Sequence, residues 1–326
     1  MNKTLELFLP KILKQLGAEK ILRIDKIQNL WSDYGAIYRL YLEKSKVPSV
    51  VVKCISYEKK DKHPRGWASN RSHQRKLDSY KIENNWYENY AASLPKTVKV
   101  PQLLYSEERE TAQLLVLEDL STAYPTLKQS CSYQEAEAVV KWLAQFHAHF
   151  LNAPAKGLWA TGSYWHLETR AEEWQAMESG PLKEKAKDLD LLLSKAKFQT
   201  IIHGDAKVAN FCFGDNSQVA AVDFQYVGKG VGVKDLAYFI GSCFTSEKCT
   251  LYEDKLLDCY FEELNNSNKK LNEKEKITLE KEWRELFPIA WADFNRFLMG
   301  WLPSHHKLHK HAMVKNKEAL RYIERL

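Results

Sequence analysis

The sequence HGDAKVAN at residues 203–210, followed by VDFQ at residues 222–225, contains the most informative pattern in this 326-residue chain. Two isoleucines lead into the first stretch, and a short apolar run leads into the second. Between them, residues 211–213 and 218–222 flank the polar segment GDNS at 214–217. This pattern predicts a β-hairpin with a four-residue turn. Such a hairpin would bring the two polar stretches together.

The polar residues of these stretches match what phosphoryl transfer to a hydroxyl requires. That reaction needs a carboxylate to orient the hydroxyl and accept its proton, oxygen ligands for Mg²⁺, and a cation near the transferred group. Asp205 can serve as the base, Asn210 and Asp223 can bind the metal, and Lys207 can reach the phosphoryl group. Alone, Asp205 or Asn210 would indicate only a turn or a helix cap, and His203 is expected to pack and hydrogen-bond the loop. The combination carries the hypothesis.

Upstream of residue 120 the pattern predicts strands and one helix. Residues 75–92 predict the helix, because tyrosines recur there at three- and four-residue spacing and share a face with Glu83. Four runs rich in β-branched and aromatic residues predict short strands: Ile21–Ile27, Ala36–Leu42, Val47–Ile55 and Gln113–Leu117.

The turn-rich segment Ser121–Pro125 marks the expected boundary between an N-terminal lobe of residues 1–120 and a C-terminal lobe of residues 121–326. Beyond it, Ser132–Leu151 predicts an amphipathic helix with Ser132 as its cap. Residues after Lys234 also have a helical pattern. A strand-rich first part and a helical second part indicate an α+β protein.

Two charged residues of the first part interrupt apolar patterns. Lys53 lies inside a Val-rich strand, which is also typical of an edge strand that carries a protective charge. Glu83 lies on an aromatic helix face, where a carboxylate needs a cationic partner or an edge position.

HGDxKxxN followed by DFQ resembles the motifs of the aminoglycoside phosphotransferase and choline-kinase-like branch of the protein-kinase-like fold. The resemblance is closest to the ecdysteroid kinase-like subgroup, in which DFQ replaces the DFG of protein kinases. It implies a bilobal α+β fold with a small antiparallel sheet and one helix in the first lobe and mostly helices in the second. It also implies ATP and Mg²⁺ as cofactors, Asp205 as catalytic base, and Asn210 and Asp223 as metal ligands.

The same resemblance implies that the N-terminal lobe holds the nucleotide. Lys53 would bind the α- and β-phosphates while paired with Glu83, and Glu88, on the more polar side of the helix, is the alternative partner. In the C-terminal lobe, Asp235 matches a family residue that braces the catalytic loop.

Two further N-terminal segments match nucleotide-binding elements of the family. The turn that ends at Gly35 stands where a loop would cover the phosphates, and with a single glycine it would rely on Ser32 or on backbone amides. Glu118, Asp119 and Leu120 match the hinge, whose backbone groups would receive the adenine edge.

The phosphate acceptor is expected to be small. Only eleven residues separate Asp223 from Asp235, and no APE-like anchor follows, so a peptide-docking platform has little room. Amino alcohols, sterol-like alcohols and sugars or aminoglycosides all stay open as acceptors. Six C-terminal residues could surround a choline-like cation, line an apolar alcohol pocket or form helical core: Trp283, Trp291, Asp293, Phe294, Trp301 and Tyr322.

The composition is that of a globular protein, with 44% hydrophobic and 28% charged residues and a net charge of +6. Lys and Arg are spread along the chain among 42 acidic residues, which does not favour a nucleic-acid partner. No apolar run approaches the ~20 residues of a membrane span. The six cysteines form no CxxC pair, so we expect reduced thiols in a cytoplasmic monomer or homodimer.

The alternative function is a catalytically inactive nucleotide-binding module. Loss of catalytic activity usually removes at least one of the residues Lys53, Asp205, Asn210 and Asp223, and all four are present here. A basic nucleic-acid-binding scaffold is a third hypothesis.

The glycine-rich residues 228–232 lack Walker spacing and predict a flexible loop near the metal site. The histidines at 305, 306, 309 and 311 alternate with lysines, which favours a solvated basic segment over a metal site.

Overall fold

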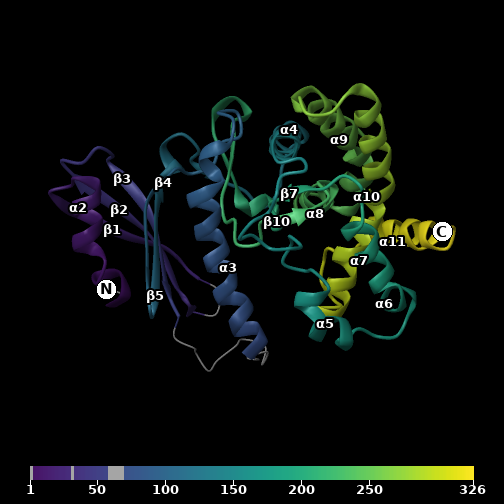
Figure 1. Ribbon diagram of the computed structural model, residues 1–326, viewed down its shortest axis with the longest axis horizontal. Helices are drawn as coiled ribbons and strands as arrows, with labels where there is room; N and C mark the ends of the chain where they lie inside the picture. The colour runs from purple at the N-terminus through teal and green to yellow at the C-terminus, as the bar shows by residue number, and fades with distance from the viewer. Residues whose placement is uncertain (1–2, 31–32, 58–69) are drawn as a thin grey trace. The chain divides into compact units, whose positions relative to one another are not determined.

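The computed structural model describes residues 3–30, 33–57 and 70–326. They form two compact units (Figure 1). The N-terminal unit consists of Met1–Ser93 and Val100–Pro125, and the C-terminal unit of Leu94–Lys99 and Thr126–Leu326.

The N-terminal unit is built on a five-stranded antiparallel sheet with the strand order β1-β2-β3-β5-β4. The strands are β1 (Lys20–Asn29), β2 (Gly35–Glu43), β3 (Ser49–Ser56), β4 (Leu103–Arg109) and β5 (Ala112–Glu118). The four expected strands are present. β4 was not expected, because as a partly exposed edge strand it shows no clear alternation of apolar residues.

Helices cover both faces of this sheet (Figure 1). Helices α1 (Lys3–Glu6) and α2 (Leu9–Leu16) pack on one face, against buried residues such as Leu40 and Val52. Helix α3 (Asn70–Asn89) packs on the other face, where its Tyr80 joins a cluster with Ile55. Because side chains alternate along a strand, Lys53 of β3 shares the α3 face with Ile55.

The C-terminal unit is mostly helical, as expected. Its helices are α4 (Tyr133–His149), α5 (Ala171–Ala176), α6 (Pro181–Glu184), α7 (Ala186–Ser194), α8 (Val233–Cys243), α9 (Ser246–Ser267), α10 (Glu273–Trp301) and α11 (Lys310–Ile323). The long helix α10 lies at the centre and contacts α5, α7, α8 and α11 (Figure 1). Ser132 caps α4 in a capping box with Glu135, which confirms the helix start inferred from sequence.

Short strands in this unit carry the polar stretches singled out above. They are β6 (Thr126–Leu127), β7 (Thr200–Ile202), β8 (Phe211–Phe213), β9 (Val219–Ala221) and β10 (Gly228–Gly230). Strands β8 and β9 pair as the expected hairpin. Strand β10 pairs with β7, so the prediction of a flexible glycine loop is wrong for these residues. A side chain at Gly228 would lie 2.3 Å from the Trp159 carbonyl oxygen, so close packing explains this glycine.

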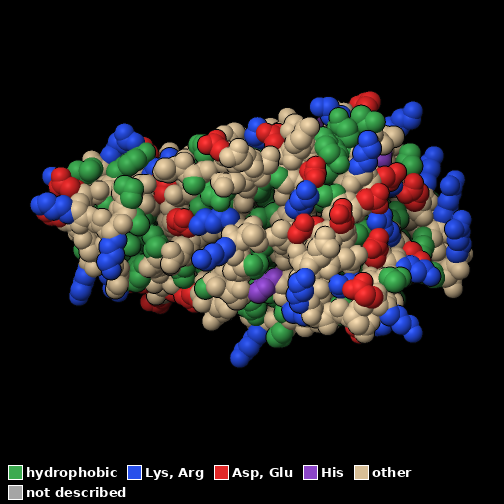
Figure 2. Space-filling view, turned by 90° about the horizontal axis from the view of Figure 1, so that it is seen from above, with side chains coloured by type: hydrophobic (Ala, Val, Ile, Leu, Met, Phe, Trp, Pro, Cys, Tyr) green, Lys and Arg blue, Asp and Glu red, His purple; other side chains and the backbone are tan. Residues whose placement is uncertain are grey.

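Short 3₁₀ helices in the described residues include η2 (Ala91–Ser93), η3 (Leu120–Thr122), η4 (Glu168–Arg170), η5 (Val208–Asn210) and η6 (Asp215–Ser217). None of the helices in the described part of the chain is both long and apolar enough to cross a membrane. On the face shown in Figure 2, Lys and Arg side chains lie among Asp and Glu side chains and form no single basic stripe. The α+β class is confirmed.

Candidate active site

The loop after β7 is held by the carboxylate of Asp235 in helix α8. Its Oδ2 accepts the backbone N–H of His203 at 2.6 Å, and its Oδ1 accepts that of Gly204 at 2.9 Å. Gly204 has a φ of 76°, and an added Cβ would lie 2.0 Å from the Tyr226 carbonyl oxygen. The loop therefore needs glycine at this position and a buried carboxylate beneath it.

His203 joins this loop to the segment that contains DFQ. Its Nε2 lies 3.0 Å from the Val222 carbonyl oxygen, which can only accept, so Nε2 carries the hydrogen. Its Nδ1 accepts the backbone N–H of Asp205 at 3.2 Å, and its ring centroid is 4.5 Å from that of Phe224. Both ring nitrogens are thus used, in agreement with the expected structural role of His203.

The two carboxylate oxygens of Asp205 have different surroundings. Oδ2 accepts hydrogen bonds from Lys207 Nζ and Asn210 Nδ2, each at 3.0 Å. Oδ1 is buried and has no hydrogen-bond partner among the described residues. An unpaired buried carboxylate oxygen costs free energy, so its presence indicates a ligand position. A substrate hydroxyl could donate its hydrogen there.

Asn210 and Asp223 offer oxygen atoms beside this carboxylate. The Asn210 amide nitrogen is bound by Asp205, and no hydrogen bond within the described residues uses the Asn210 Oδ1. Asp223 has a φ of 68°, in the left-handed region, which costs a non-glycine residue about 1–2 kcal/mol. Strain of this kind is concentrated at functional sites.

Lys207 lies in the field of both acidic residues. The negative charge of Asp205 raises the pKa of Lys207 against the opposing effect of burial, and Asp223 raises it further. Carboxylate and amide oxygens are the ligands that Mg²⁺ prefers, and two such ligands suffice when nucleotide phosphates supply others. The residues present therefore fit a phosphate-bound Mg²⁺ ion.

In the N-terminal unit, Lys53 and Glu83 form a buried ion pair. Lys53 Nζ lies 2.5 Å from Glu83 Oε2, and the two residues are 4% and 1% exposed. Strand β3 lies between β2 and β5, so an edge-strand charge does not explain Lys53. The alternative partner, Glu88, instead accepts the Ser106 hydroxyl at 2.6 Å.

The side chains of the expected hinge are engaged in holding the chain. The Asp119 carboxylate accepts hydrogen bonds from Arg39 Nε at 2.8 Å and from the Ser49 hydroxyl at 2.7 Å. Burial alone would raise the pKa of Asp119, but these partners lower it overall. Glu118 accepts the Gln102 backbone N–H at 3.0 Å, and Leu120 is buried.

The expected phosphate-covering turn is only partly described. Ser32 lies outside the described residues. Gly35 has a φ of 143°, and an added Cβ would lie 2.0 Å from the Cys54 carbonyl oxygen. Packing against β3 is therefore sufficient reason for the glycine at this position.

The six C-terminal residues considered for the acceptor do not form one group. Trp283 and Trp291 are fully buried in the helical core. Tyr322 lies on α11, where its hydroxyl is 3.3 Å from Glu285 Oε2. Phe294 and Trp301 belong instead to an aromatic cluster that also contains Trp165, Tyr238 and Phe297. Asp293 is buried between Lys234 and Arg296, with charge-pair distances of 3.4 and 2.8 Å.

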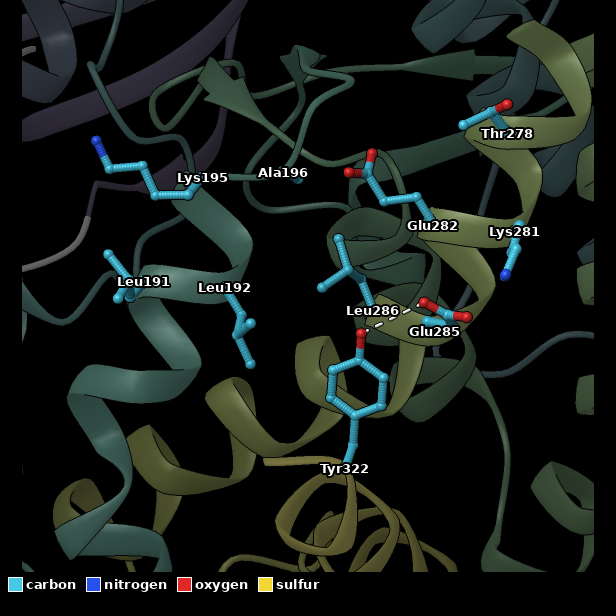
Figure 3. Close-up of a pocket in the computed structure, with 10 residues that line it drawn as sticks. All are labelled: Leu191, Leu192, Lys195, Ala196, Thr278, Lys281, Glu282, Glu285, Leu286 and Tyr322. Carbon is cyan, nitrogen blue, oxygen red and sulfur yellow. Dashed lines mark hydrogen bonds between the residues drawn. The ribbon is translucent and has the colours of Figure 1, made fainter. Parts of the chain in front are cut away.

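Figure 3 shows a surface pocket of about 520 Å³ around Tyr322. It is lined by residues of α7, α10 and α11, among them Leu192, Glu282 and Leu286. The Glu282 carboxylate already accepts the backbone N–H groups of residues 197 and 198. No catalytic residue expected from sequence lines this pocket.

The C-terminal histidines do not gather around a metal position. No group of three or more His, Cys, Asp or Glu side chains with metal-binding geometry occurs in the described ranges. His309 accepts the Ala312 backbone N–H as the cap of α11. His311 is buried and lies 2.9 Å from Glu253, so the prediction of a solvated segment is wrong for this residue.

Sequence reasoning missed three residues near the catalytic loop. The Tyr164 backbone N–H donates to the Gly204 carbonyl at 3.2 Å. The Tyr164 hydroxyl bonds that of Tyr238 at 3.2 Å, and Lys307 Nζ lies 4.7 Å from the Tyr238 ring centroid. They come from an irregular segment, a buried helix and a connection between helices, so no local pattern could have grouped them.

The fold agrees with comparisons to known proteins. Residues 39–265 match the model of the phosphotransferase enzyme family, APH, which is more than half of the chain. No curated protein sequence matches the chain significantly.

Solved structures of three enzymes share the fold. A mutant of aminoglycoside phosphotransferase APH(4)-Ia, in complex with ADP and hygromycin B, has 12% identity, a TM-score of 0.51 and 97% coverage of each chain. The choline kinase LicA from Streptococcus pneumoniae has 15% identity, a TM-score of 0.50 and 100% coverage of each chain. A macrolide 2′-phosphotransferase from Brachybacterium faecium has 12% identity and a TM-score of 0.50, covering 99% of this chain and 98% of its own.

The α+β architecture is therefore that of the protein-kinase-like fold. The chain belongs to the phosphotransferase enzyme family, whose members transfer phosphate from ATP to hydroxyls of small molecules.

Proposed function

We propose that this protein transfers the γ-phosphate of ATP to a hydroxyl of a small alcohol, with Asp205 as the base and Mg²⁺ held by Asn210 and Asp223. The observation behind this proposal is that the two carboxylate oxygens of Asp205 have different surroundings. Lys207 and Asn210 fix Oδ2, while the buried Oδ1 has no hydrogen-bond partner among the described residues. That oxygen can orient an attacking hydroxyl and take up its proton as the new O–P bond forms.

The surrounding residues have separate tasks in this reaction. When bound, Mg²⁺ would neutralise the nucleotide phosphates, with Asn210 Oδ1 and the Asp223 carboxylate as its protein ligands. Lys207 donates to Asp205 and would shift to the transferred phosphoryl oxygens as their charge grows. Asp235 and His203 fix the loop, so the base need not be reorganised during the reaction.

The proposal gives nucleotide binding to the N-terminal residues inferred from the family. Lys53, fixed by Glu83, would bind the α- and β-phosphates of ATP. Backbone groups of residues 118–120 would bind adenine, and the turn at Gly35 would cover the phosphates. Within the family, the DFQ sequence at 223–225 favours the ecdysteroid kinase-like subgroup.

Two observations support a small acceptor and an intracellular setting. After Asp223 the chain enters β10 at Gly228 and α8 at Val233, which leaves no long segment for docking a peptide. All six cysteines are free, and five are buried, as suits a protein of the reducing cytoplasm.

The test compares Asp205→Asn with the wild type in an ATP-consumption screen over amino alcohols, sterols, sugars and aminoglycosides. We expect turnover by the wild type and a loss of about 10²–10⁴-fold in the variant, because its amide cannot accept the proton. Mg²⁺-dependent binding of ATP, measured by calorimetry, should be nearly unchanged. Asp215→Asn, an exposed acid in the β8–β9 turn, is the matched control.

Full activity of Asp205→Asn would refute the assignment of the base. If the wild type binds ATP and Mg²⁺ but turns over neither an acceptor of this panel nor any of a set of hydroxy acids, the chain is the inactive nucleotide-binding module instead.

A further inference from the structure

A largely buried aromatic cluster begins directly at the catalytic loop. Tyr164 is bonded through its backbone to Gly204, the residue before Asp205, and its ring centroid is 5.7 Å from that of Tyr238. The Tyr238 ring packs in turn against Phe294, with a centroid distance of 4.7 Å. Rings from three separate segments thus form one cluster that reaches the catalytic loop through Tyr164.

Lys307 packs against this cluster. Its Nζ is 4.7 Å from the Tyr238 ring centroid and 5.7 Å from that of Phe294, within the range of cation–π attraction. A choline-like ligand would need an aromatic face for its own cation. Here the protein's own ammonium group takes that position on both rings.

The other cations that touch the aromatic cluster each have an acidic partner. Arg170 pairs with Glu173 at 2.9 Å, and Lys234 and Arg296 both pair with Asp293. Lys307, in contrast, forms no ion pair with any acid of the described chain. Among the cations that touch this cluster, it is the one without an acidic partner within the described residues.

The surroundings of Lys307 make that charge costly. Burial lowers the pKa of Lys307 to about 8, although the nearby Asp205 carboxylate raises it and Lys207 lowers it further. The remaining titratable group that acts on it is Cys243, whose own pKa is raised well above normal by burial. An anionic ligand would therefore recover electrostatic free energy that the folded protein leaves unused.

We propose that Lys307 selects the acceptor, and that the acceptor is a hydroxyl compound that carries a carboxylate group beside an apolar or aromatic body. This inference rests on the proposed kinase function, because it assigns the substrate class of the same site. In the complex, Lys307 pairs with the carboxylate, the body of the acceptor lies against the half-buried Tyr164, and the hydroxyl reaches Asp205 Oδ1. Cationic acceptors are disfavoured by repulsion from Lys307.

Three benzyl alcohols whose para substituent is anionic, neutral or cationic test this selection: 4-(hydroxymethyl)benzoate, 1,4-benzenedimethanol and 4-(hydroxymethyl)benzylamine. Binding of each to the full chain is measured by titration calorimetry, and phosphate transfer from ATP is measured separately. The wild type should bind the carboxylate about tenfold or more tightly than the amine, as expected for one charge-assisted contact. The diol should fall between them.

Variants assign the selection to Lys307. Lys307→Glu should reverse the order of carboxylate and amine, and Lys307→Arg, which keeps the charge, should preserve it. Lys310→Glu makes the same change of net charge at an exposed residue three positions away and should leave the order unchanged. Wild-type binding that is equal for the three compounds, strongest for the amine, or absent for the carboxylate would overturn the inference.

The two proposals fail in different ways. Transfer to the diol or amine with no preference for the carboxylate would retain the kinase and refute the role of Lys307. Selective binding of the carboxylate with no transfer to any acceptor would support the selection by Lys307 and refute the kinase.

Discussion

Lys53 and Lys307 both have a poorly solvated ammonium group, but only Lys53 has an ion-pair partner among the described residues. On β3, Lys53 is 4% exposed and forms an ion pair with Glu83 of α3. On the connection between α10 and α11, Lys307 lies over aromatic rings and pairs with no acid of the described chain. Lys53 has its counter-charge in the folded protein, whereas Lys307 has none among the described residues. Removal of each should therefore change stability in opposite directions.

The largest effect on stability is expected from Lys53→Met. The substitution leaves the Glu83 carboxylate buried without its lysine partner, which typically costs 3–5 kcal/mol, so about that loss in the free energy of unfolding is expected. Urea denaturation measures it. The double variant Lys53→Met with Glu83→Gln should regain most of the stability and still fail to bind ATP tightly.

A surface pair provides the control for that experiment. Lys44 lies 2.5 Å from Glu19, but the two side chains are 74% and 53% exposed. Lys44→Met should therefore cost no more than about 1 kcal/mol. If both lysine variants lose the same stability, the Lys53–Glu83 pair has no special role in the scaffold.

A smaller effect of opposite sign is expected from Lys307→Met. At pH 7 the wild-type lysine carries a charge that burial disfavours, and methionine fills similar space against Tyr238 without that charge. The free energy of unfolding should rise by an amount on the order of 1 kcal/mol. A clear loss of stability would show that Lys307 is a structural residue and would remove the contrast with Lys53.

The smallest effect is the pH dependence of the difference in free energy of unfolding between Lys307→Met and the wild type. The pKa of Lys307 is about 8 in the folded protein and about 10.5 when unfolded, so between these values the unfolded chain binds more protons. The free energy of unfolding of the wild type should therefore rise as the pH rises from about 8 to about 10.5, because the folded Lys307 is then already neutral. The advantage of Lys307→Met should be full below pH 8 and vanish near pH 10.5, as measured by urea denaturation across that range. A constant difference would mean that the pKa of Lys307 is not lowered.

The contrast also shows what the sequence could predict. Lys53 and Glu83 were found because each interrupts a regular apolar pattern, and such interruptions need a partner. The spacing of Asp205, Asn210 and Asp223 was informative because one hairpin brings them together within a short stretch of chain. Predictions that depended on local pattern were therefore confirmed for the hairpin, the capped helix and the buried pair.

Features made by distant segments could not be predicted in this way. Strand β10 looks like a flexible glycine loop, and only its pairing with β7 and packing on Trp159 reveal a strand. Lys307 lies among histidines and lysines that suggest a solvated segment. Its contacts with Tyr238 and Phe294 depend on how helices α8 and α10 pack, and no local spacing records that.

The anchoring of the catalytic loop has a consequence for how this protein could change over time. Asp235 holds the loop through two backbone bonds and also lies 3.2 Å from His147 of α4, which in turn bonds Tyr260 of α9. A substitution at any of these buried positions disturbs the base, so few should be tolerated. Lys307 belongs to a short connection whose residues are half-buried or exposed. Acceptor preference could thus be altered by one substitution there while the phosphate-transfer chemistry is inherited intact.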